Sequence, residues 1–402
     1  MSIQRRDFLK GLTSIAAIAS LPLNASASKK ANVEQHWLSV APYLQNPGAD
    51  EMTIMWQTSS ASFSRVEYGL TQDLGQVAHS FINGQKQANN TLNSIRITEL
   101  TPGQSYFYRC VSKEIISYEP YEVKFGTEHF TELKSFRCLD PNASDDFSVI
   151  FFNDLHDNLK LTQDLTRNNP AKDFSFSVFN GDCFNDPMGE EAVLDSLCVY
   201  NESVDAANIP PLYIRGNHEI RGAYARNLPQ HFANPGNSLY YSFTHAGVRF
   251  VVLDTGEDKP DDNEGYSGLN HFEPFIIEQA AWLKEEIASN QFKEARFRVL
   301  IHHIPLYGND KTYSGDYNIG KTHWGEMLKD AAVDLAISGH THTHKIHKVG
   351  DEGNPYPVVI GGGRRDSSGT LTSLAFTQEQ IQIKMYGSKG QILRQYNIME
   401  RS

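Results

Sequence analysis

Three features are scarce in this sequence: cysteine, positive charge and long apolar runs. Only four of the 402 residues are cysteines, which argues against a metal store or chaperone built from soft ligands. The 36 basic residues are outnumbered by 48 acidic ones, and the resulting net charge of −12 argues against a nucleic-acid binder. No run of about twenty apolar residues is present, so the sequence predicts no stable membrane anchor.

The cysteines allow three complete disulfide pairings, and the sequence does not choose among them. They are Cys110, Cys138, Cys183 and Cys198. Cys110 and Cys138 form one candidate pair because they flank the expected junction between two domains. Cys183 directly follows a candidate metal ligand, and we expect it to be a small buried apolar residue rather than a ligand.

The first 27 residues resemble a bacterial twin-arginine export signal. Arg5-Arg6 is followed by Phe8-Leu9-Lys10, by a mildly apolar stretch from Gly11 to Leu23 and by the cleavage-site pattern Ala25-Ser26-Ala27. The apolar stretch is too short to span a bilayer. We therefore expect a mature protein that is periplasmic or secreted after passage through the twin-arginine export machinery.

Residues 35–130 show the pattern of an all-β domain. Short segments alternate apolar and polar side chains, and turns rich in glycine, proline and asparagine separate them. The expected strands lie at residues 52–56, 65–68, 94–97, 106–110 and 121–125. We predict a β-sandwich of about 90 residues without a catalytic role.

The pattern changes after residues 131–146, a polar segment that we interpret as a linker. From residue 147 to residue 402, continuous apolar strands alternate with helical stretches, the clearest of which is Gln279–Ala288. This alternation predicts an α/β layered domain. Its strands are expected at residues 147–152, 175–179, 211–214, 248–253, 297–301 and 335–338, with more strands between residues 358 and 398.

Five short motifs follow these strands, and their side chains are of the types that bind metal ions. They are, in chain order, Asp154-Leu155-His156, Gly181-Asp182, Gly216-Asn217-His218-Glu219, His303-Ile304-Pro305 and Gly339-His340-Thr341-His342. Imidazole and carboxylate ligands suit zinc, iron, manganese or nickel better than a thiolate-loving ion. Because ligands bind at the carboxyl ends of strands in open α/β sheets, we expect the five motifs to converge.

In this order, the motifs resemble those of the calcineurin-like metallophosphoesterases, over roughly residues 145–350. The stretch from Ala41-Pro42-Tyr43-Leu44-Gln45 to Trp56, with the turn Leu100-Thr101-Pro102-Gly103, resembles the N-terminal domain of purple acid phosphatases. The resemblance implies a fibronectin III-like β-sandwich followed by the α+β sandwich of the metallophosphoesterases. It also implies a metal-dependent phosphoric ester hydrolase.

The resemblance assigns the ligands to two metal ions, with Asp182 bridging them. The first ion takes Asp154, His156, Asp182 and His342, and the second takes Asp182, Asn217, His303 and His340. Two cations about 3.5–4 Å apart clamp the phosphoryl oxygens and lower the pKa of a shared water, so that a metal-bridging hydroxide attacks phosphorus. The ions are iron, zinc or manganese, and the ligands do not distinguish among them.

The expected catalytic residues are His218 and Asp182. The resemblance implies that His218 binds a phosphoryl oxygen or protonates the leaving oxygen, and Glu219 is a candidate for orienting nearby groups. Asn217 and His218 are also expected to contact the substrate. Arg364, which follows three glycines, is a further candidate for binding the phosphate, and an exposed polar turn is the alternative.

Other polar residues near the motifs have structural interpretations. We expect His302 to be buried on the strand face opposite its neighbour His303. We interpret His344 and His347 as residues around the ligands or on the surface. The acidic stretch from Glu257 to Glu264 is interpreted as a solvated loop, or as a wall of the cleft that disfavours very anionic substrates.

The chain departs from purple acid phosphatases at two positions. Asn185 lies three residues after Asp182, where that family has the tyrosine whose phenolate colours the ferric site. The first motif contains His156, which that family lacks. We therefore expect no tyrosinate absorption band. Asp186, one residue further on, is a candidate for orienting His218.

Together, these features predict an exported dinuclear phosphoesterase that hydrolyses phosphate monoesters of small molecules. A phosphodiesterase of the same family is the nearest alternative, because the ligand set does not separate the two activities. A non-catalytic binding module of the cell envelope is the second alternative. A degenerate homologue usually lacks a ligand or the catalytic histidine, and this sequence retains all of them.

Overall fold

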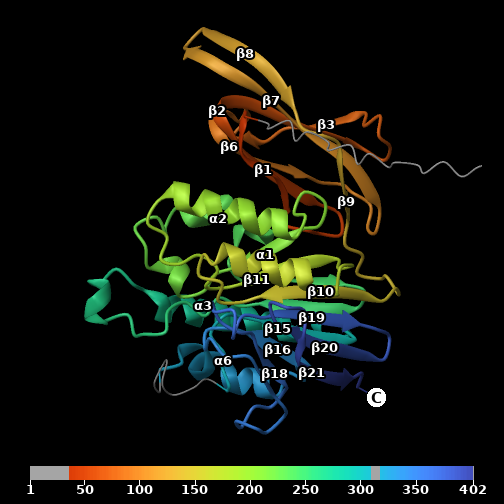
Figure 1. The fold of residues 1–402 in the computed structure, drawn as a ribbon, viewed down its shortest axis with the longest axis vertical. Coiled ribbons are helices and arrows are strands. Elements are labelled where there is room, and N and C mark those ends of the chain that lie inside the picture. The colour runs from red at the N-terminus through yellow and green to blue at the C-terminus, as the bar shows by residue number, and fades with distance from the viewer. Residues whose placement is uncertain (1–35, 309–316, 402) are drawn as a thin grey trace, which may run out of the picture. The chain divides into compact units, whose positions relative to one another are not determined.

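A computed structural model describes residues 36–308 and 317–401 of the chain. The expected export signal at residues 1–27 lies outside the described residues. Among the helices of the described part, none is both long and apolar enough to cross a bilayer. The described chain forms an all-β region up to residue 137 and an α/β region from residue 147 onward (Figure 1).

The N-terminal region is built around two long strands, β2 and β7, which pair with most of the others. The seven strands of this sheet are β1 (Leu38–Gln45), β2 (Met52–Gly69), β3 (Gln76–Ala78), β6 (Ala88–Ile97), β7 (Ser105–Glu119), β8 (Glu122–Phe130) and β9 (Lys134–Arg137). A small hairpin contains β4 (Phe81–Ile82) and β5 (Gln85–Lys86). The all-β prediction is confirmed, and all strands of the region except β4 and β5 are hydrogen-bonded into one sheet.

Two details of this region differ from the prediction. Residues 52–56 and 65–68 belong to the single strand β2, because a register shift against β6 after Gln57 lets the strand continue through a polar interruption. The expected linker at residues 131–146 contains β9, which pairs with β7. Phe136 holds this strand in place, because its side chain is buried in the core of the sheet.

The α/β region contains two six-stranded sheets that face each other. The first sheet, in spatial order, consists of β12 (Pro211–Ile214), β11 (Phe176–Asn180), β10 (Phe147–Phe152), β19 (Leu371–Phe376), β20 (Gln380–Tyr386) and β21 (Ile392–Met399). The second consists of β13 (Tyr241–His245), β14 (Val248–Val252), β15 (Phe297–Ile301), β16 (Leu335–Ser338), β18 (Val358–Ile360) and β17 (Lys345–His347). The central strands β10–β12 and β14–β16 with β18 are parallel within their sheets.

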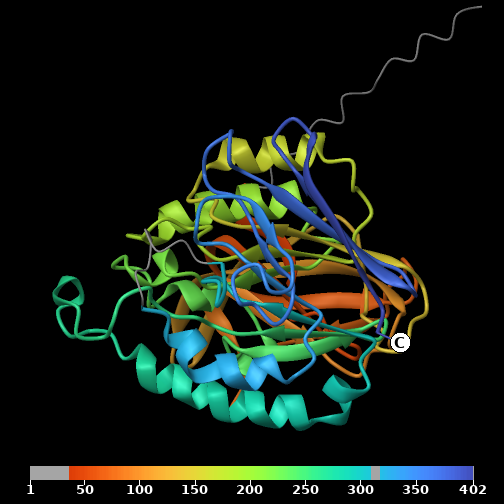
Figure 2. The ribbon, with the colours of Figure 1, turned by 90° about the horizontal axis from the view of Figure 1, so that it is seen from below.

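Helices cover the outer faces of both sheets and complete a four-layered sandwich (Figure 2). The first sheet is covered by α1 (Leu159–Asn168) and α2 (Glu190–Ser203), and the second by α3 (Phe272–Ala288), α4 (Asn290–Lys293) and α6 (Ile319–Lys329). Single 3-10 turns are η1 (His218–Ile220), η2 (Leu228–His231), η3 (Pro235–Asn237) and η4 (Glu264–Tyr266). The predicted layered α/β fold is confirmed, and α3 begins seven residues before its predicted start.

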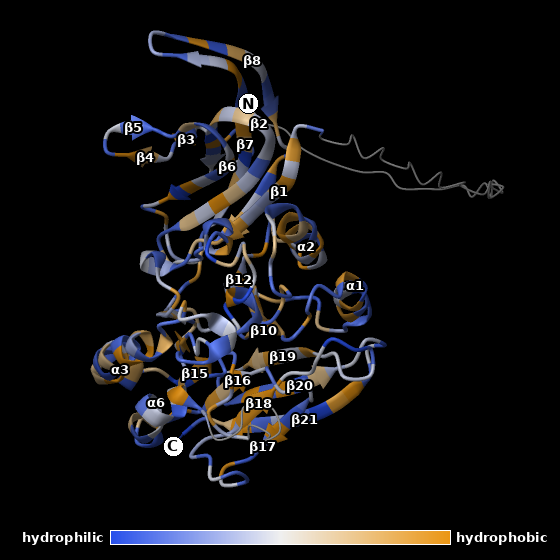
Figure 3. Ribbon diagram, turned by 90° about the vertical axis from the view of Figure 1, so that its left-hand side faces the viewer, coloured by the Kyte–Doolittle hydropathy of each residue, from blue (hydrophilic) through white to orange (hydrophobic). Residues whose placement is uncertain are grey.

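Apolar side chains from both sheets meet in the middle layer of the sandwich. Phe151, Phe250, Val299 and Leu374 are fully buried there, which explains the strongly hydrophobic strands in Figure 3. At about 25 cal/mol for each Å² of apolar surface removed from water, this layer is a major stabilising contribution. It also fixes the two sets of parallel strand ends relative to each other.

The N-terminal sheet is bonded to the α/β region through β1 and β7. The backbone N–H of Leu44 donates to the carbonyl of Ala206 at 2.8 Å, and the Tyr108 hydroxyl donates to the carbonyl of Ala207 at 2.6 Å. Val40 and Tyr43 of β1 are buried in the same core cluster as residues of α2. The sheet therefore shares its interior with the domain that carries the site.

The candidate disulfide between Cys110 and Cys138 is not formed. All four cysteines are free thiols. Cys110 and Cys138 are both packed in the core of the N-terminal sheet, where burial raises their pKa values. The expectation for Cys183 is confirmed, because its side chain is buried among apolar residues.

Candidate metal centre

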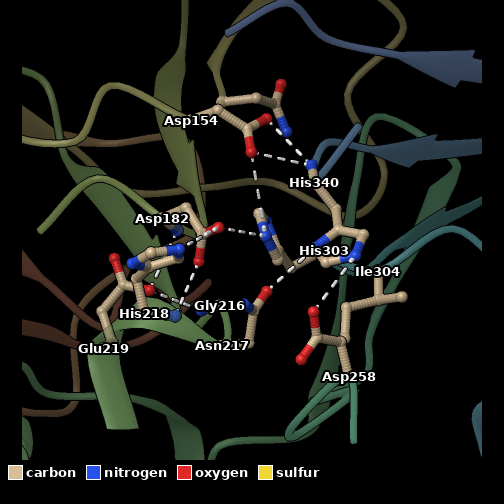
Figure 4. A network of polar contacts seen from close by, with 12 residues as sticks. Asp154, Asp182, Gly216, Asn217, His218, Glu219, Asp258, His303, Ile304 and His340 are labelled. Atoms are coloured by element: carbon tan, nitrogen blue, oxygen red, sulfur yellow. Dashed lines mark hydrogen bonds and ion pairs between the residues drawn. The ribbon is translucent and has the colours of Figure 1, made fainter. Parts of the chain in front are cut away.

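The five motifs lie in loops that leave the carboxyl ends of parallel strands. Those of the first sheet follow β10, β11 and β12, and those of the second sheet follow β15 and β16. The side chains are, in this order, Asp154 and His156, Asp182, Asn217 and His218, His303, and His340 and His342. Because the two sheets face each other, these loops converge on one place (Figure 4).

Five of these side chains are attached to a backbone with positive φ. The φ angles are 52° at Asp154, 47° at His156, 51° at Asp182, 70° at His340 and 57° at His342. Residues other than glycine rarely adopt this conformation, which persists only where the surrounding structure imposes it. Such a concentration at one place indicates a functional site.

Four ligand atoms form the first group. Asp154, His156, Asp182 and His342 each offer one atom, and all four atoms lie within 4.8 Å of one another. The Nε2 atoms of His156 and His342 are 2.9 Å apart, and His342 Nε2 is 3.6 Å from Asp154 Oδ1. Two imidazole nitrogens and two carboxylates around one point make a ligand set typical of a transition-metal ion.

The second group shares Asp182 with the first. It contains Asp182, His303 and His340, whose ligand atoms also lie within 4.8 Å of one another. His303 Nε2 is 3.1 Å from Asp182 Oδ2, and Asn217 Oδ1 is 3.0 Å from His340 Nδ1. The structure thus brings together all seven residues expected as ligands, with Asp182 common to both groups.

The residues themselves fit metal ions. His303 Nδ1 lies 2.9 Å from the carbonyl of Asn180, which can only accept, so the neutral ring has its lone pair on Nε2. That Nε2 is buried without a well-aligned hydrogen bond in the described chain. Burial alone lowers the pKa of His303, but the Asp182 and Asp154 carboxylates outweigh it and raise the pKa to about 10. The Asp182 and Asp154 carboxylates therefore favour a positive charge beside His303 Nε2.

Glu219 holds two of the ligand loops together. Its buried carboxylate accepts four backbone hydrogen bonds, from Asp182 at 2.9 Å, Cys183 at 2.7 Å, Phe184 at 3.0 Å and Gly216 at 2.8 Å. Burial, assisted by the charge of Asp182, raises the pKa of Glu219 to about 7. The predicted orienting role therefore takes a specific form, in which Glu219 organises the backbone of the loops.

His218 lies at the open edge of the centre. Its Nε2 is 4.0 Å from Asp182 Oδ2, and its side chain is 21% exposed. Its Nδ1 lies 3.0 Å from Asp186 Oδ1, where the sequence suggested an orienting carboxylate. Asn185, which replaces the expected tyrosine, contacts His156 Nδ1 through Oδ1 at 3.0 Å.

Arg364 lies at the end of a glycine turn beside a ligand. A Cβ atom on Gly363 would be only 2.6 Å from the Cβ of His342, so only glycine allows this approach. The Arg364 side chain is exposed, and its carbonyl accepts a hydrogen bond from Asn158. A substrate contact by Arg364 therefore stays a prediction.

The other expectations for neighbouring residues have mixed outcomes. His302 is buried as predicted, with Nδ1 3.0 Å from the carbonyl of Ile304. His344 is partly exposed, whereas His347 is buried and packs against Gly308.

The interpretation of the whole acidic stretch as a solvated loop is wrong. Glu257 and Asp258 are buried, because both form ion pairs with Arg221. Asp258 Oδ2 also lies 3.9 Å from His340 Nε2. Arg221 is not among the residues expected from the sequence, although its position three residues after His218 places it on the same short turn.

Comparisons with known proteins agree with this geometry. A family model for the calcineurin-like phosphoesterases matches residues 147–344, and one for the purple acid phosphatase N-terminal domain matches residues 39–127. Purple acid phosphatase 21 of Arabidopsis thaliana is 25% identical over 348 residues, which are 79% of this chain and 70% of that protein.

Two solved structures share the fold of the chain. A purple acid phosphatase from yellow lupin (Lupinus luteus) seeds has a TM-score of 0.66 at 16% identity, over 89% of this chain and 74% of that one. PhoD has a TM-score of 0.61 at 12% identity, over 92% of this chain and 94% of that one.

The family models, the related sequences and the ligand set together define a metal-dependent phosphoesterase with two adjacent candidate metal-binding groups. The two matching family models cover well over half of the sequence. The chain belongs to the calcineurin-like metallophosphoesterases and carries the N-terminal domain of the purple acid phosphatases.

Proposed function

We propose that the chain is an exported phosphatase that hydrolyses phosphate monoesters of small molecules at two metal ions. The observation that carries the proposal is the carboxylate of Asp182, which belongs to both ligand groups and would be shared by two ions held there. The name of its Arabidopsis relative, a purple acid phosphatase, supports a phosphatase over a phosphodiesterase.

In the proposed mechanism, the metal ions and the protein side chains have separate roles. The seven ligand candidates would hold two cations, which would supply the chemistry of lowering the pKa of a water molecule and neutralising phosphoryl oxygens. His218, whose Nε2 is at the partly exposed edge of the centre, gives a proton to the leaving oxygen. Asp186 holds the ring of His218 from its Nδ1 side, and Glu219 keeps the loops of Asp182 and Asn217 in register.

A hydrolysis panel tests the activity. Protein reconstituted with iron, zinc or manganese is assayed with aryl phosphate monoesters and with bis-aryl phosphate diesters, beside Asp182→Asn and His218→Ala. We expect hydrolysis of monoesters by the parent protein and near loss of activity in both variants. A dominant diester rate would identify the phosphodiesterase alternative. No hydrolysis, despite bound metal by elemental analysis, would favour the binding module.

The absence of tyrosine at position 185 gives a spectroscopic expectation. A phenolate bound to ferric iron absorbs visible light, and the side chain at this place is the amide of Asn185. Iron-loaded protein should therefore lack a purple charge-transfer band, whichever substrate it hydrolyses. Visible absorption of the oxidised protein measures this directly.

Export is a separate proposal, supported by the sequence pattern of residues 1–27. Replacing Arg5 and Arg6 with lysine should retain a fusion protein in the cytoplasm. The unchanged fusion should appear in the periplasm or the medium of a bacterial host. Normal export of the double variant would contradict the proposal and would leave the proposed hydrolysis untouched.

A further inference from the structure

Arg221 lies between the candidate catalytic histidine and a buried pair of carboxylates. Its Nη1 is 3.2 Å from His218 Nε2. Its Nε donates to Glu257 Oε2 at 3.0 Å, and its Nη2 donates to Asp258 Oδ1 at 2.9 Å. We call Arg221, Glu257 and Asp258 the arginine clamp. One edge of the guanidinium is thereby fixed, and the Nη1 end faces His218.

Within the arginine clamp, the two carboxylates are more deeply buried than the guanidinium, which lies nearer to His218. The side chain of Glu257 is 0% exposed and that of Asp258 is 8% exposed, whereas the Arg221 side chain is 21% exposed. A guanidinium has five N–H donors in one plane, two of them on each terminal nitrogen. The two carboxylates engage Nε and Nη2, and one Nη1 N–H is directed at His218 Nε2, so the second Nη1 N–H is the donor that faces the partly exposed space beside His218.

The charges of the clamp are balanced locally. Lys259 Nζ lies 2.5 Å from Asp258 Oδ1, so two cationic and two anionic side chains form one cluster. The Nη1 donors are therefore oriented without a net positive charge behind them. Such a donor binds an oxygen of one phosphoryl group well, but it adds little attraction for a second phosphate.

We propose that Arg221 binds a phosphoryl or leaving-group oxygen beside His218, and that its neutralisation by the clamp restricts the site to esters of a single phosphate. The inference rests on the proposed phosphatase function and deepens it by naming the substrate class. Alkyl and aryl phosphate monoesters are then substrates, whereas pyrophosphates and nucleoside polyphosphates are disfavoured.

A purely structural role for the clamp makes different predictions. Asp258 Oδ2 lies 3.9 Å from Nε2 of the ligand candidate His340 (Figure 4). If the clamp served only to hold His340, its disruption would lower bound metal and all activities in parallel. The experiment therefore leaves Asp258 unchanged and includes the metal content of every variant.

Three variants separate the roles of donor and charge. Arg221→Met combined with Glu257→Gln removes the donor without leaving a buried carboxylate unpaired. Arg221→Lys keeps the charge but not the planar fork. Glu257→Gln alone keeps the donor and raises the charge of the cluster by one unit. The matched control is Arg249→Met with Glu286→Gln, which removes another buried ion pair that lies between β14 and α3.

The assays are steady-state hydrolysis of phenyl phosphate and of inorganic pyrophosphate, and calorimetric binding of inorganic phosphate to metal-loaded protein. In the Arg221→Met/Glu257→Gln variant, we expect phosphate affinity and kcat/KM for phenyl phosphate to fall by on the order of tenfold or more. Arg221→Lys should recover part of the loss. Glu257→Gln should raise the kcat/KM for pyrophosphate relative to phenyl phosphate by on the order of fivefold.

For Glu257→Gln, we expect a gain in the kcat/KM for pyrophosphate relative to phenyl phosphate. A variant whose site was merely disrupted would not show such a gain. An unchanged substrate ratio in Glu257→Gln, or parental phosphate affinity in the variant without Arg221, would overturn the inference. A parallel loss of metal and of both activities would overturn it as well, in favour of the structural role. If the parent protein hydrolyses no ester, the proposed function fails, and phosphate calorimetry still decides whether Arg221 binds the anion.

Discussion

Replacing Glu219 with glutamine is the most informative single perturbation of the centre. The substitution keeps the size of the side chain and exchanges one carboxylate oxygen for an amide nitrogen. Each oxygen of Glu219 accepts two backbone N–H groups. Whichever oxygen is exchanged, two donors of the ligand loops then face another donor.

The loss of stability in Glu219→Gln can be worked out from these four hydrogen bonds. A hydrogen bond to a charged group is worth about 1.5–3 kcal/mol, so losing two of them costs roughly 3–6 kcal/mol. Burial opposes ionisation of Glu219 and raises its pKa to about 7, so part of this gain is already offset in the parent protein. We therefore expect the lower end, about 3 kcal/mol in the free energy of unfolding.

Denaturant unfolding of chelator-treated protein measures this loss without a contribution from bound metal. Hydrolysis by metal-loaded protein should fall in the same variant, because Asp182 and Gly216 belong to the loops that carry the ligands. The exposed Glu285→Gln provides the control, with a change below about 0.5 kcal/mol. Parental stability together with full activity in Glu219→Gln would refute the reasoning.

Three further predictions concern the backbone, the metal and pH. Gly181→Ala places a Cβ 2.3 Å from His303 Nδ1 at a φ of 80°, so elemental analysis should show reduced metal, whereas Gly189→Ala has open space and should bind metal normally. Chelation should lower the melting temperature, since a ligand at a thousandfold excess over its Kd stabilises the folded state by about 4 kcal/mol. A melting temperature that does not change when the chelator is added would contradict bound metal. Burial lowers the pKa of His245 to about 4, so the unfolded state, with a histidine pKa near 6.5, binds more protons between these values. The stability contributed by His245 should consequently fall by about 2 kcal/mol from pH 7 to pH 5. His245→Gln, which can still accept the N–H of Asp140, should flatten that slope, and an unchanged slope would contradict the assignment.

The ligands were predictable from the sequence because their signals are local. Each motif directly follows a run of apolar residues, and parallel strand ends share an edge. Asp154, Asp182 and His303 could therefore be placed near one another from the order of strands and motifs alone. The choice of His303 over His302 rested on the family resemblance, in which the ligand lies two residues before the proline, here Pro305.

The arginine clamp could not be found in this way. Arg221 and Glu257 are 36 residues apart in the chain, and they meet because β12 and β14 lie in different sheets that face each other. A run of acidic residues normally indicates a solvent-exposed segment. Only the position of a partly buried cation, here Arg221, shows that two of these carboxylates are buried. The surface alternative for His347 was wrong for a similar reason, since its side chain is buried against Gly308.

The shared interior of the N-terminal sheet and the catalytic domain has a consequence for how the protein unfolds. Val40 and Tyr43 fill the same apolar cluster as Leu197 and Tyr200 of α2. Removing the sheet would open that cluster to water, on the side of the domain that carries the loop of Asp182. We therefore expect the two regions to unfold as a single cooperative unit, in which the N-terminal sheet is part of the scaffold that supports the metal centre.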